Sequence, residues 1–110
     1  MAGKKILTVC SANVNRSTTT AWLLKIIDNK NEVWSGGSSK AACRIHGGTF
    51  CTSEDVTDAD EILCMEDRNR KELLALYGNE IDKKIRVLCI EDKFKAFSAE
   101  LIMEILTKLD

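Results

Sequence analysis

Cys10 and Arg16 stand six positions apart in the run Cys10-Ser-Ala-Asn-Val-Asn-Arg16-Ser17, between a predicted strand and a predicted helix. A short loop of small and amide residues can turn several backbone N–H groups inward, and the helix behind it adds the positive end of its dipole. The planar guanidinium of Arg16 can bind two oxygens of a phosphate at once. The spacing therefore predicts a loop that binds phosphate or another oxyanion.

Within this loop, Cys10 is the predicted nucleophile. A thiol beside a cation and a helix N-terminus ionises readily, and the Ser17 hydroxyl can donate a hydrogen bond to the thiolate. Asn13 can hold the loop through side-chain bonds to the local backbone. Around a bound phosphate we expect Ser11, Ala12, Asn13, Val14, Asn15 and Ser17. The alternative is that Cys10 is a buried core cysteine at the end of a strand.

A second segment, Cys64-Met-Glu-Asp-Arg-Asn-Arg70, has the same spacing and also lies between a predicted strand and a predicted helix. Its Glu66 and Asp67 would repel a phosphate, and Lys71 stands where the first loop has a hydroxyl. The first loop contains no carboxylate. We therefore assign the chemistry to Cys10 and interpret Cys64 as a buried strand residue.

The elements that position the loop alternate between strands and helices. Short apolar runs predict strands at Lys5–Cys10, Glu32–Ser35, Glu61–Met65 and Ile85–Ile90. Helical spacing and end signals predict helices from Ser17 to about Asp28, from a cap at Asp67 to a stop at Gly78, and from a cap at Ser98 to Leu109. The stretch 38–57 indicates only a helical turn at Lys40–Ile45 followed by a glycine-containing loop.

This order predicts an α/β fold of three layers: a four-stranded parallel sheet with helices on both faces, in a single domain over residues 1–110. The functional crevice of such a sheet lies beyond the carboxyl ends of its strands. Cys10 and the segment Ile90–Lys93 both lie at such ends.

Composition argues against several other classes. The 110 residues are 45% hydrophobic and 30% charged, and the net charge of −1 favours neither nucleic acid nor a membrane surface as a partner. The apolar runs are too short to span a bilayer, and the first residues do not resemble a secretory signal. The five cysteines match no zinc spacing. We expect a cytoplasmic monomer or weak dimer with reduced thiols and without a metal or other cofactor.

The run Val9–Ser17 resembles the phosphate-binding loop of the low-molecular-weight protein tyrosine phosphatases. That family places an asparagine three residues after its nucleophilic cysteine, an arginine six after it and a serine seven after it, as here. Trp34–Gly37 is similar to the turn after the family's second strand, Asp60–Met65 to its third strand, and Ile90–Ile102 to a compact bacterial and phage branch. The resemblance implies a phosphotyrosine phosphatase I-like fold and hydrolysis of phosphomonoesters, phosphotyrosine foremost, through a phosphocysteine and without metal.

Some positions depart from the family's pattern. Ala12 replaces a glycine, and Asn15 replaces a second cysteine, so the family's protective disulfide with the nucleophile is not available. The family's general acid is an aspartate followed by proline and an aromatic residue, whereas this chain has no proline. Aligning on Phe94 places Asp92 in the acid position, with Glu91 as the alternative. The alternative interpretation is that both carboxylates are solvated loop charges. Phe94 either lines the leaving-group pocket or packs in the core.

Three other functions share parts of this pattern. Arsenate reductases with a similar loop pass electrons through two further cysteines, for which Cys43 and Cys51 are the candidates. Phosphocysteine carriers of sugar-transport systems resemble the fold but do not typically have an arginine at the position of Arg16. A module that binds phosphorylated ligands without turnover is the remaining alternative if Asp92 is not in place.

A few further residues have both a structural and a functional interpretation. His46, the only histidine, either lines the substrate entrance or is simply exposed, and the same alternatives hold for Arg44 and Phe50. Trp22 lies at helical spacing and is predicted to be in the core. The acidic run 54–61 is interpreted as a solvated turn and not as a metal site.

Overall fold

A four-stranded parallel sheet with the order β2-β1-β3-β4 forms the centre of the fold. The computed structural model describes residues 3–109, and its strands are β1 (Lys5–Cys10), β2 (Glu32–Gly37), β3 (Glu61–Cys64) and β4 (Ile85–Val87). β1 pairs in parallel with β2 on one side and with β3 on the other. The connections that leave the sheet after β1 and β3 therefore diverge, and such a point is where open α/β sheets bind ligands.

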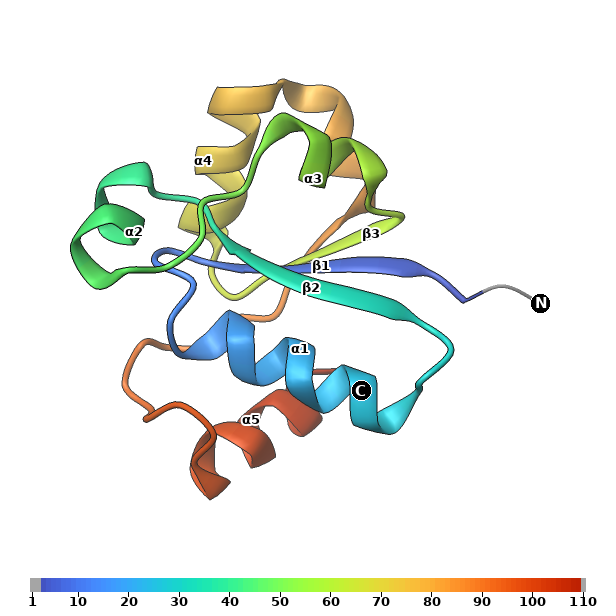
Figure 1. Cartoon of the computed structure of the whole chain (residues 1–110), viewed down its shortest axis with the longest axis vertical. Helices are drawn as coiled ribbons and strands as arrows, with labels where there is room; N and C mark the ends of the chain where they lie inside the picture. The colour runs from blue at the N-terminus through green and yellow to red at the C-terminus, as the bar shows by residue number, and fades with distance from the viewer. Residues whose placement is uncertain (1–2, 110) are drawn as a thin grey trace.

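Helices cover both faces of this sheet, which confirms the predicted three layers (Figure 1). One face carries α1 (Arg16–Ile27) and α5 (Ala99–Leu109), and the other carries α3 (Ser53–Asp58) and α4 (Asp67–Tyr77). A 3₁₀ helix, η1 (Asn79–Lys84), leads into β4, and α2 (Lys40–His46) lies beyond the carboxyl end of β2. Among residues 3–109, no helix is long and apolar enough to cross a membrane.

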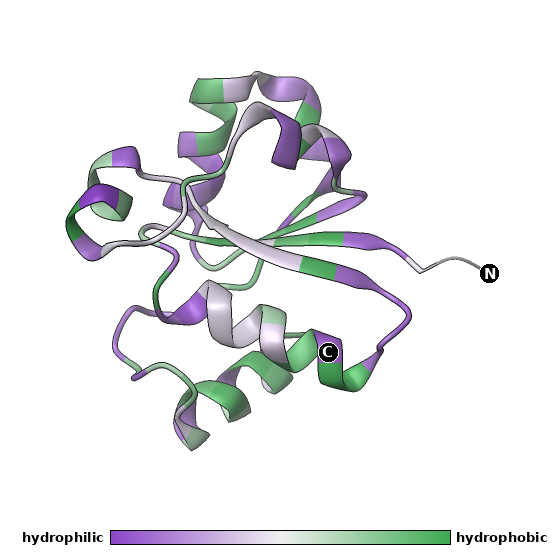
Figure 2. Cartoon of the chain, viewed as in Figure 1, coloured by the Kyte–Doolittle hydropathy of each residue, from purple (hydrophilic) through white to green (hydrophobic). Residues whose placement is uncertain are grey.

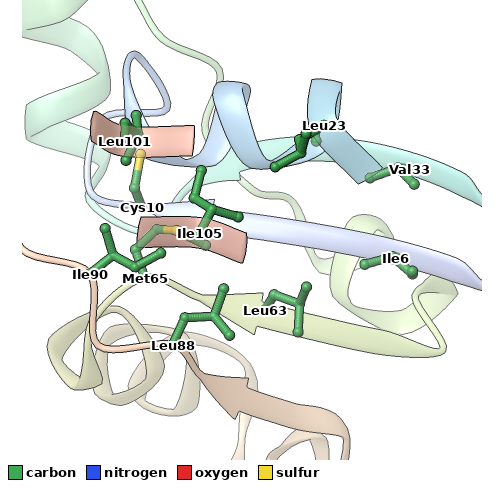
Figure 3. Packing of buried hydrophobic residues seen from close by; sticks show 11 residues of the cluster. Ile6, Cys10, Leu23, Val33, Leu63, Met65, Leu88, Ile90, Leu101 and Ile105 are labelled. Atoms are coloured by element: carbon green, nitrogen blue, oxygen red, sulfur yellow. The ribbon is translucent and has the colours of Figure 1, made fainter. Parts of the chain in front are cut away.

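Two apolar cores separate the layers because side chains alternate along β1. Leu7 and Val9 face the core under α3 and α4, whereas Ile6 and Cys10 face the core under α1 and α5. In Figure 2 the apolar colour marks part of β1 and covers much of α5. Figure 3 shows Cys10 at one end of its core, near Leu101. The nucleophile candidate thus stands where an apolar core meets the carboxyl edge of the sheet.

The buried face of α1 is not the one that its apolar residues predict. Trp22 and Ile26 are exposed, so the prediction of a core position for Trp22 is wrong. Thr19 and Thr20 are fully buried in their place. Each threonine hydroxyl donates to a main-chain carbonyl four residues earlier, at 2.7 and 2.8 Å. Because these hydroxyls are satisfied within the helix, they can be buried without an unpaired polar group.

Several boundaries differ from those predicted. β2 runs through Gly36 and Gly37 instead of ending before them. β4 ends at Val87, because Cys89 has a φ of +59° and breaks the extended run. Ile90 nevertheless reaches back to the sheet, and its N–H donates to the Met65 carbonyl at 2.8 Å.

The segments around α2, α3 and α4 also differ in part. Stretch 38–57 contains α2 and the start of α3, and the acidic run begins inside α3 instead of forming a turn. Glu66, not Asp67, occupies the N-cap of α4. The predicted cap at Ser98 is confirmed, since its Oγ accepts the Leu101 N–H at 3.2 Å.

Candidate functional site

The loop after β1 closes around the sulfur of Cys10. The Asn13 N–H donates to Cys10 Sγ at 3.2 Å, and Ser17 Oγ lies 3.0 Å from the same sulfur. Asn13 makes this turn possible with a φ of +57°, a left-handed conformation that asparagine tolerates better than most residues. Cys10 is only 3% exposed, yet it lines a pocket. Its sulfur is therefore held among polar groups at the bottom of a concavity.

One hydroxyl group can serve both protonation states of this sulfur. Ser17 Oγ lies 2.8 Å from Asn13 Oδ1 as well as beside Cys10 Sγ. With a thiol at Cys10, the S–H donates to Ser17 Oγ, which donates onward to Asn13. With a thiolate, the Ser17 O–H donates to the sulfur, and Asn13 can turn its amide so that Nδ2 donates to Ser17.

Several backbone N–H groups of this loop have no internal hydrogen-bond partner in the described part of the chain. The structure gives no hydrogen-bond acceptor within residues 3–109 to the N–H groups of Ser11, Ala12, Val14 and Asn15. The first turn of α1 follows at once, and its leading N–H groups also lack helical partners. Because Ser11, Ala12, Val14 and Asn15 line the pocket, their unpaired N–H groups are available to an anion bound there.

Arg16 completes the concavity while being only 2% exposed. Its Nη1 donates to the Ile90 carbonyl at 2.8 Å and to Glu66 Oε1 at 2.6 Å. Every fully buried side-chain nitrogen or oxygen in residues 3–109 has a partner. Nε and Nη2 have no hydrogen-bond acceptor in that part of the chain, so they are the edge that solvent reaches. Two N–H groups on one guanidinium edge match two oxygens of a phosphate.

Glu66 was not predicted to belong to this site. It follows β3, which lies beside β1, so the sheet brings its carboxylate to Arg16. Arg68 Nη2 lies 3.3 Å from the same Oε1. Burial alone would raise the pKa of Glu66, but the hydrogen bond from Arg16 and the charges of Arg16 and Arg68 outweigh it and hold that pKa below its ordinary value. Glu66 therefore stays ionised and holds the guanidinium of Arg16 in place.

A buried polar network supports the loop from behind. Asn69 Nδ2 donates to Ser11 Oγ at 3.2 Å and to Ser38 Oγ at 3.1 Å. Ser38 Oγ in turn donates to Glu72 Oε1 at 2.7 Å. Sequence analysis missed Ser38 and Glu72, because nothing near them in the chain marks them as partners. The only signal is that Ser38 follows β2 and Glu72 lies in the helix after β3.

Two glycines let neighbouring segments approach the loop closely. A Cβ on Gly37 would lie 2.2 Å from Cys43 Sγ of α2, and a Cβ on Gly48 would lie 1.6 Å from the Ala12 carbonyl oxygen. Cys43 Sγ also packs 3.6 Å from the Ser11 carbonyl oxygen. Any larger residue at either glycine would push on the concavity.

The resulting pocket has a volume of ≈ 350 Å³. It is lined by Cys10, Ser11, Ala12, Val14, Asn15, Arg16, Ser39, Ala42, His46, Arg68, Glu72 and Asp92. The structure thus brings together most of the predicted loop residues, while Asn13 and Ser17 lie behind them against the sulfur. No Phe, Tyr or Trp side chain is among these lining residues. His46 lines the pocket, whereas Arg44 and Phe50 do not.

The two candidate acids are placed differently. Asp92 lines the pocket, is 56% exposed, and has its Oδ1 3.7 Å from Arg16 Nε. Glu91 is 75% exposed, is not among the lining residues, and faces Lys93 at 3.6 Å. Phe94 packs against the core under α1 and α5, so it does not shape the leaving-group pocket.

The other cysteines lie outside the pocket. Cys43, Cys51 and Cys64 are buried, and Cys89 is exposed. Burial raises the pKa of the Cys43 and Cys51 thiols, and it raises the pKa of Cys64 to about 12. The interpretation of Cys64 as a buried strand residue is confirmed.

These environments predict a thiol-labelling pattern. At pH 7 we expect iodoacetamide to modify Cys10, through the pocket, and the exposed Cys89. Cys64 should stay unlabelled, because a thiol of pKa about 12 is ionised only to the order of 10⁻⁵ at that pH. Inorganic phosphate should slow labelling of Cys10 and leave that of Cys89 unchanged. Peptide mass spectrometry of labelled native protein measures both rates. Labelling of Cys10 that phosphate does not slow would contradict an anion site at this sulfur.

The chain is similar in structure to several solved phosphatases. No protein-family model matches the chain, and no curated protein matches it. Among solved structures, Wzb from Vibrio vulnificus in complex with benzylphosphonate is 20% identical, with 99% of this chain and 93% of that chain covered and a TM-score of 0.75. A low-molecular-weight protein tyrosine phosphatase from Streptococcus pyogenes is 19% identical, with coverages of 94% and 84% and a TM-score of 0.72.

The fold is that of the low-molecular-weight protein tyrosine phosphatases. This confirms the fold that the resemblance of residues 9–17 implies. The YwlE arginine phosphatase from Geobacillus stearothermophilus has the same fold, with 19% identity, coverages of 96% and 83% and a TM-score of 0.64. The phosphatase fold therefore accommodates more than one kind of phosphorylated group, and the pocket of each chain has to be considered by itself.

Proposed function

We propose that this protein is a metal-independent phosphatase that acts through a phosphocysteine on Cys10, with phosphotyrosine as the first candidate substrate. The observation that carries the proposal is the set of groups around one sulfur. An N–H and a hydroxyl lie on Cys10 Sγ, and the Nε–Nη2 edge of Arg16, which donates no hydrogen bond within residues 3–109, belongs to the same pocket. The matching fold of known tyrosine phosphatases supports it.

In the first step, the loop N–H groups and Arg16 hold the three non-bridging oxygens of the phosphoryl group. The Cys10 thiolate attacks phosphorus in line, so that an S–P bond forms as the bond to the leaving oxygen breaks. Charge on the phosphoryl oxygens is stabilised by donors that are already in place. Asp92, at the mouth of the pocket, donates a proton to the leaving oxygen.

In the second step, water attacks the phosphocysteine. The Asp92 carboxylate formed in the first step takes a proton from that water as the new P–O bond forms and the S–P bond breaks. The leaving thiolate is stabilised by the Ser17 hydroxyl and the Asn13 N–H. Inorganic phosphate then leaves, and the protein returns to its starting state.

Asp92→Asn should lower kcat/KM for phenyl phosphate by about 10²–10⁴-fold, because the leaving phenolate then departs without a proton. The effect on 4-nitrophenyl phosphate should be smaller, since its leaving group is a weaker base. Inhibition by inorganic phosphate should be retained, as the loop and Arg16 are unchanged. Steady-state kinetics on both esters measure these effects.

Glu91→Gln is the matched control, because it removes a neighbouring carboxylate that faces Lys93 and does not line the pocket. We expect its rates to stay within about twofold of the parent rates. A large loss in Glu91→Gln with none in Asp92→Asn would transfer the acid role to Glu91. Parent rates in both variants would leave protonation to solvent.

A specific observation favours a second candidate substrate, phosphoarginine. No Phe, Tyr or Trp side chain of residues 3–109 lines the pocket to pack against a tyrosine ring, whereas two carboxylates, Glu72 and Asp92, do line it. Carboxylates suit a guanidinium leaving group. A structural neighbour is an arginine phosphatase. Comparing kcat/KM on one peptide carrying either phosphotyrosine or phosphoarginine distinguishes the two substrates.

The remaining alternatives have less support. Asp92 at the pocket favours turnover over phosphate binding alone, and Arg16 favours hydrolysis over a phosphocarrier. An electron relay through Cys43 and Cys51 would need thiols that are here buried and hard to ionise. Arsenate-dependent consumption of a thiol reductant, lost in Cys43→Ala or Cys51→Ala, would instead favour a reductase. The predictions of a single domain over residues 1–110 and of a cytoplasmic monomer or weak dimer that binds neither nucleic acid nor membrane remain part of this proposal.

A further inference from the structure

The far end of the loop that presents Asp92 is attached to the phosphate-binding loop through a hydroxyl group. Thr19 Oγ1 donates to the Asn15 carbonyl at 2.7 Å and accepts the Phe97 N–H at 3.0 Å. Asn15 belongs to the phosphate-binding loop, and Phe97 ends the segment 91–97 that carries Asp92. Thr19 is fully buried, so water does not compete for either bond.

A ring contact adds a second attachment at the same place. The Phe97 and Trp22 rings meet edge to face, with centroids 5.4 Å apart and an interplanar angle of 83°. The rings are 50% and 43% exposed, so neither is held by a surrounding core. Phe97 also has a φ of +57°, a conformation that a non-glycine residue keeps only when neighbouring contacts hold it.

Segment 91–97, which carries the proposed acid, depends on such attachments because it has little structure of its own. Between Ile90 and α5 it forms no helix or strand, and the chain has no proline to stiffen it. Its first end is fixed at Ile90, whose N–H bonds to Met65 and whose carbonyl accepts Arg16 Nη1. Its second end is fixed at Phe97. Between these ends, Asp92 Oδ1 lies 3.7 Å from Arg16 Nε, and its carboxylate accepts no hydrogen bond from residues 3–109.

We propose that Thr19, assisted by the Trp22–Phe97 contact, is a positioning residue that keeps Asp92 over the phosphate-binding loop. The same oxygen bonds the loop that holds the nucleophile and the loop that holds the acid, so it fixes their separation. This inference rests on the proposed function, in which Asp92 protonates the leaving group. Thr19 itself touches neither substrate nor reacting atoms.

The test compares Thr19→Val, which keeps the side-chain shape and removes the hydroxyl, with Thr18→Val. Thr18 Oγ1 makes the same kind of helical bond, to the Val14 carbonyl at 2.7 Å, and has no partner in segment 91–97. For Thr19→Val we expect kcat/KM on phenyl phosphate to fall by at least about tenfold, because a displacement of about 1 Å can cost 10²-fold. On 4-nitrophenyl phosphate we expect less than about threefold, and inhibition by inorganic phosphate should not change.

Trp22→Leu tests the same claim without touching the buried hydroxyl. It should lower kcat/KM on phenyl phosphate relative to kcat/KM on 4-nitrophenyl phosphate, as Thr19→Val does, but by less. Thr18→Val should keep the parent ratio of these two values. Equal losses on both esters in Thr19→Val and Trp22→Leu would overturn the positioning role, because a merely destabilised pocket would affect both esters alike.

Hydrogen exchange provides a readout that does not depend on turnover. In Thr19→Val and Trp22→Leu, amide exchange in segment 91–97 should accelerate at least about tenfold relative to Thr18→Val, while exchange in β1 stays at the parent rate. Unchanged exchange in that segment would overturn the inference. A parent protein without phosphatase activity would overturn the proposed function, and the exchange rates would then decide by themselves whether Thr19 and Trp22 hold the loop.

Discussion

Cys10→Ser should abolish phosphatase activity, with a loss of at least about 10⁴-fold in kcat, because a serine hydroxyl in this loop is not ionised near neutral pH and residues 11–16 contain no general base to activate it. The fold should be kept, since the Asn13 N–H and Ser17 Oγ can bond to an oxygen as they do to the sulfur. Binding of inorganic phosphate should persist for the same reason. Turnover of 4-nitrophenyl phosphate and phosphate-dependent protection of the fold against heat measure the two effects.

The chain contains its own control for this experiment. Cys64 begins the second Cys-x5-Arg segment, lies fully buried in β3 and has a pKa of about 12. Cys64→Ala should therefore lower stability, by about 1–2 kcal/mol for the lost packing, and leave kcat per folded molecule unchanged. Activity in Cys10→Ser above one tenth of the parent rate would refute the assignment of the nucleophile.

Arg16→Lys should lower kcat/KM by about 10³-fold. A lysine ammonium keeps the charge, but it cannot hold Glu66 and Ile90 on one side while presenting two N–H groups to a phosphoryl group on the other. Positioned arginines of this kind contribute 10³–10⁵-fold to phosphoryl transfer. Kinetics on 4-nitrophenyl phosphate measure the loss, which should be similar for phenyl phosphate because the leaving group is not involved.

Arg70→Lys is the corresponding control in the second segment. Arg70 bonds to the two carboxylate oxygens of Asp82 at 2.7 and 2.9 Å, away from the pocket. Its replacement should leave turnover unchanged and have little effect on stability, because the ion pair with Asp82 is exposed to solvent. Arg16→Lys with parent activity would show that the charge alone suffices and that the two-pronged geometry is not used.

The phosphate-binding loop could be predicted because its parts are close in sequence. Cys10, Asn13, Arg16 and Ser17 lie within one strand–loop–helix unit, so spacing alone places them near one another. The order of strands and helices likewise predicts the parallel sheet and its three layers. Asp92 is distant from Cys10 in the sequence, so spacing alone could not place it. Its place after a predicted strand and the resemblance to a known family were both needed to predict that it lies near Cys10.

The parts of the site that escaped prediction are those that the sheet assembles. Within its own segment, Glu66 is a carboxylate that would repel a phosphate. Only the pairing of β3 beside β1 makes it the partner of Arg16. The burial of Thr19 could not be predicted from hydropathy, because the hydroxyl is satisfied by a carbonyl on its own helix and by a distant N–H. In both cases a polar side chain is placed by a partner far along the chain.

The carbonyl of Ile90 links two segments that are far apart in the sequence, because it accepts a hydrogen bond from Arg16, which is 74 positions earlier in the chain. A nascent chain of which only the first half has been synthesised still lacks the Ile90 carbonyl that helps to orient the Arg16 guanidinium. Arg16 therefore reaches its full set of partners only when the segment that follows β4 has docked, and a chain that ended before Ile90 would hold this guanidinium through Glu66 alone.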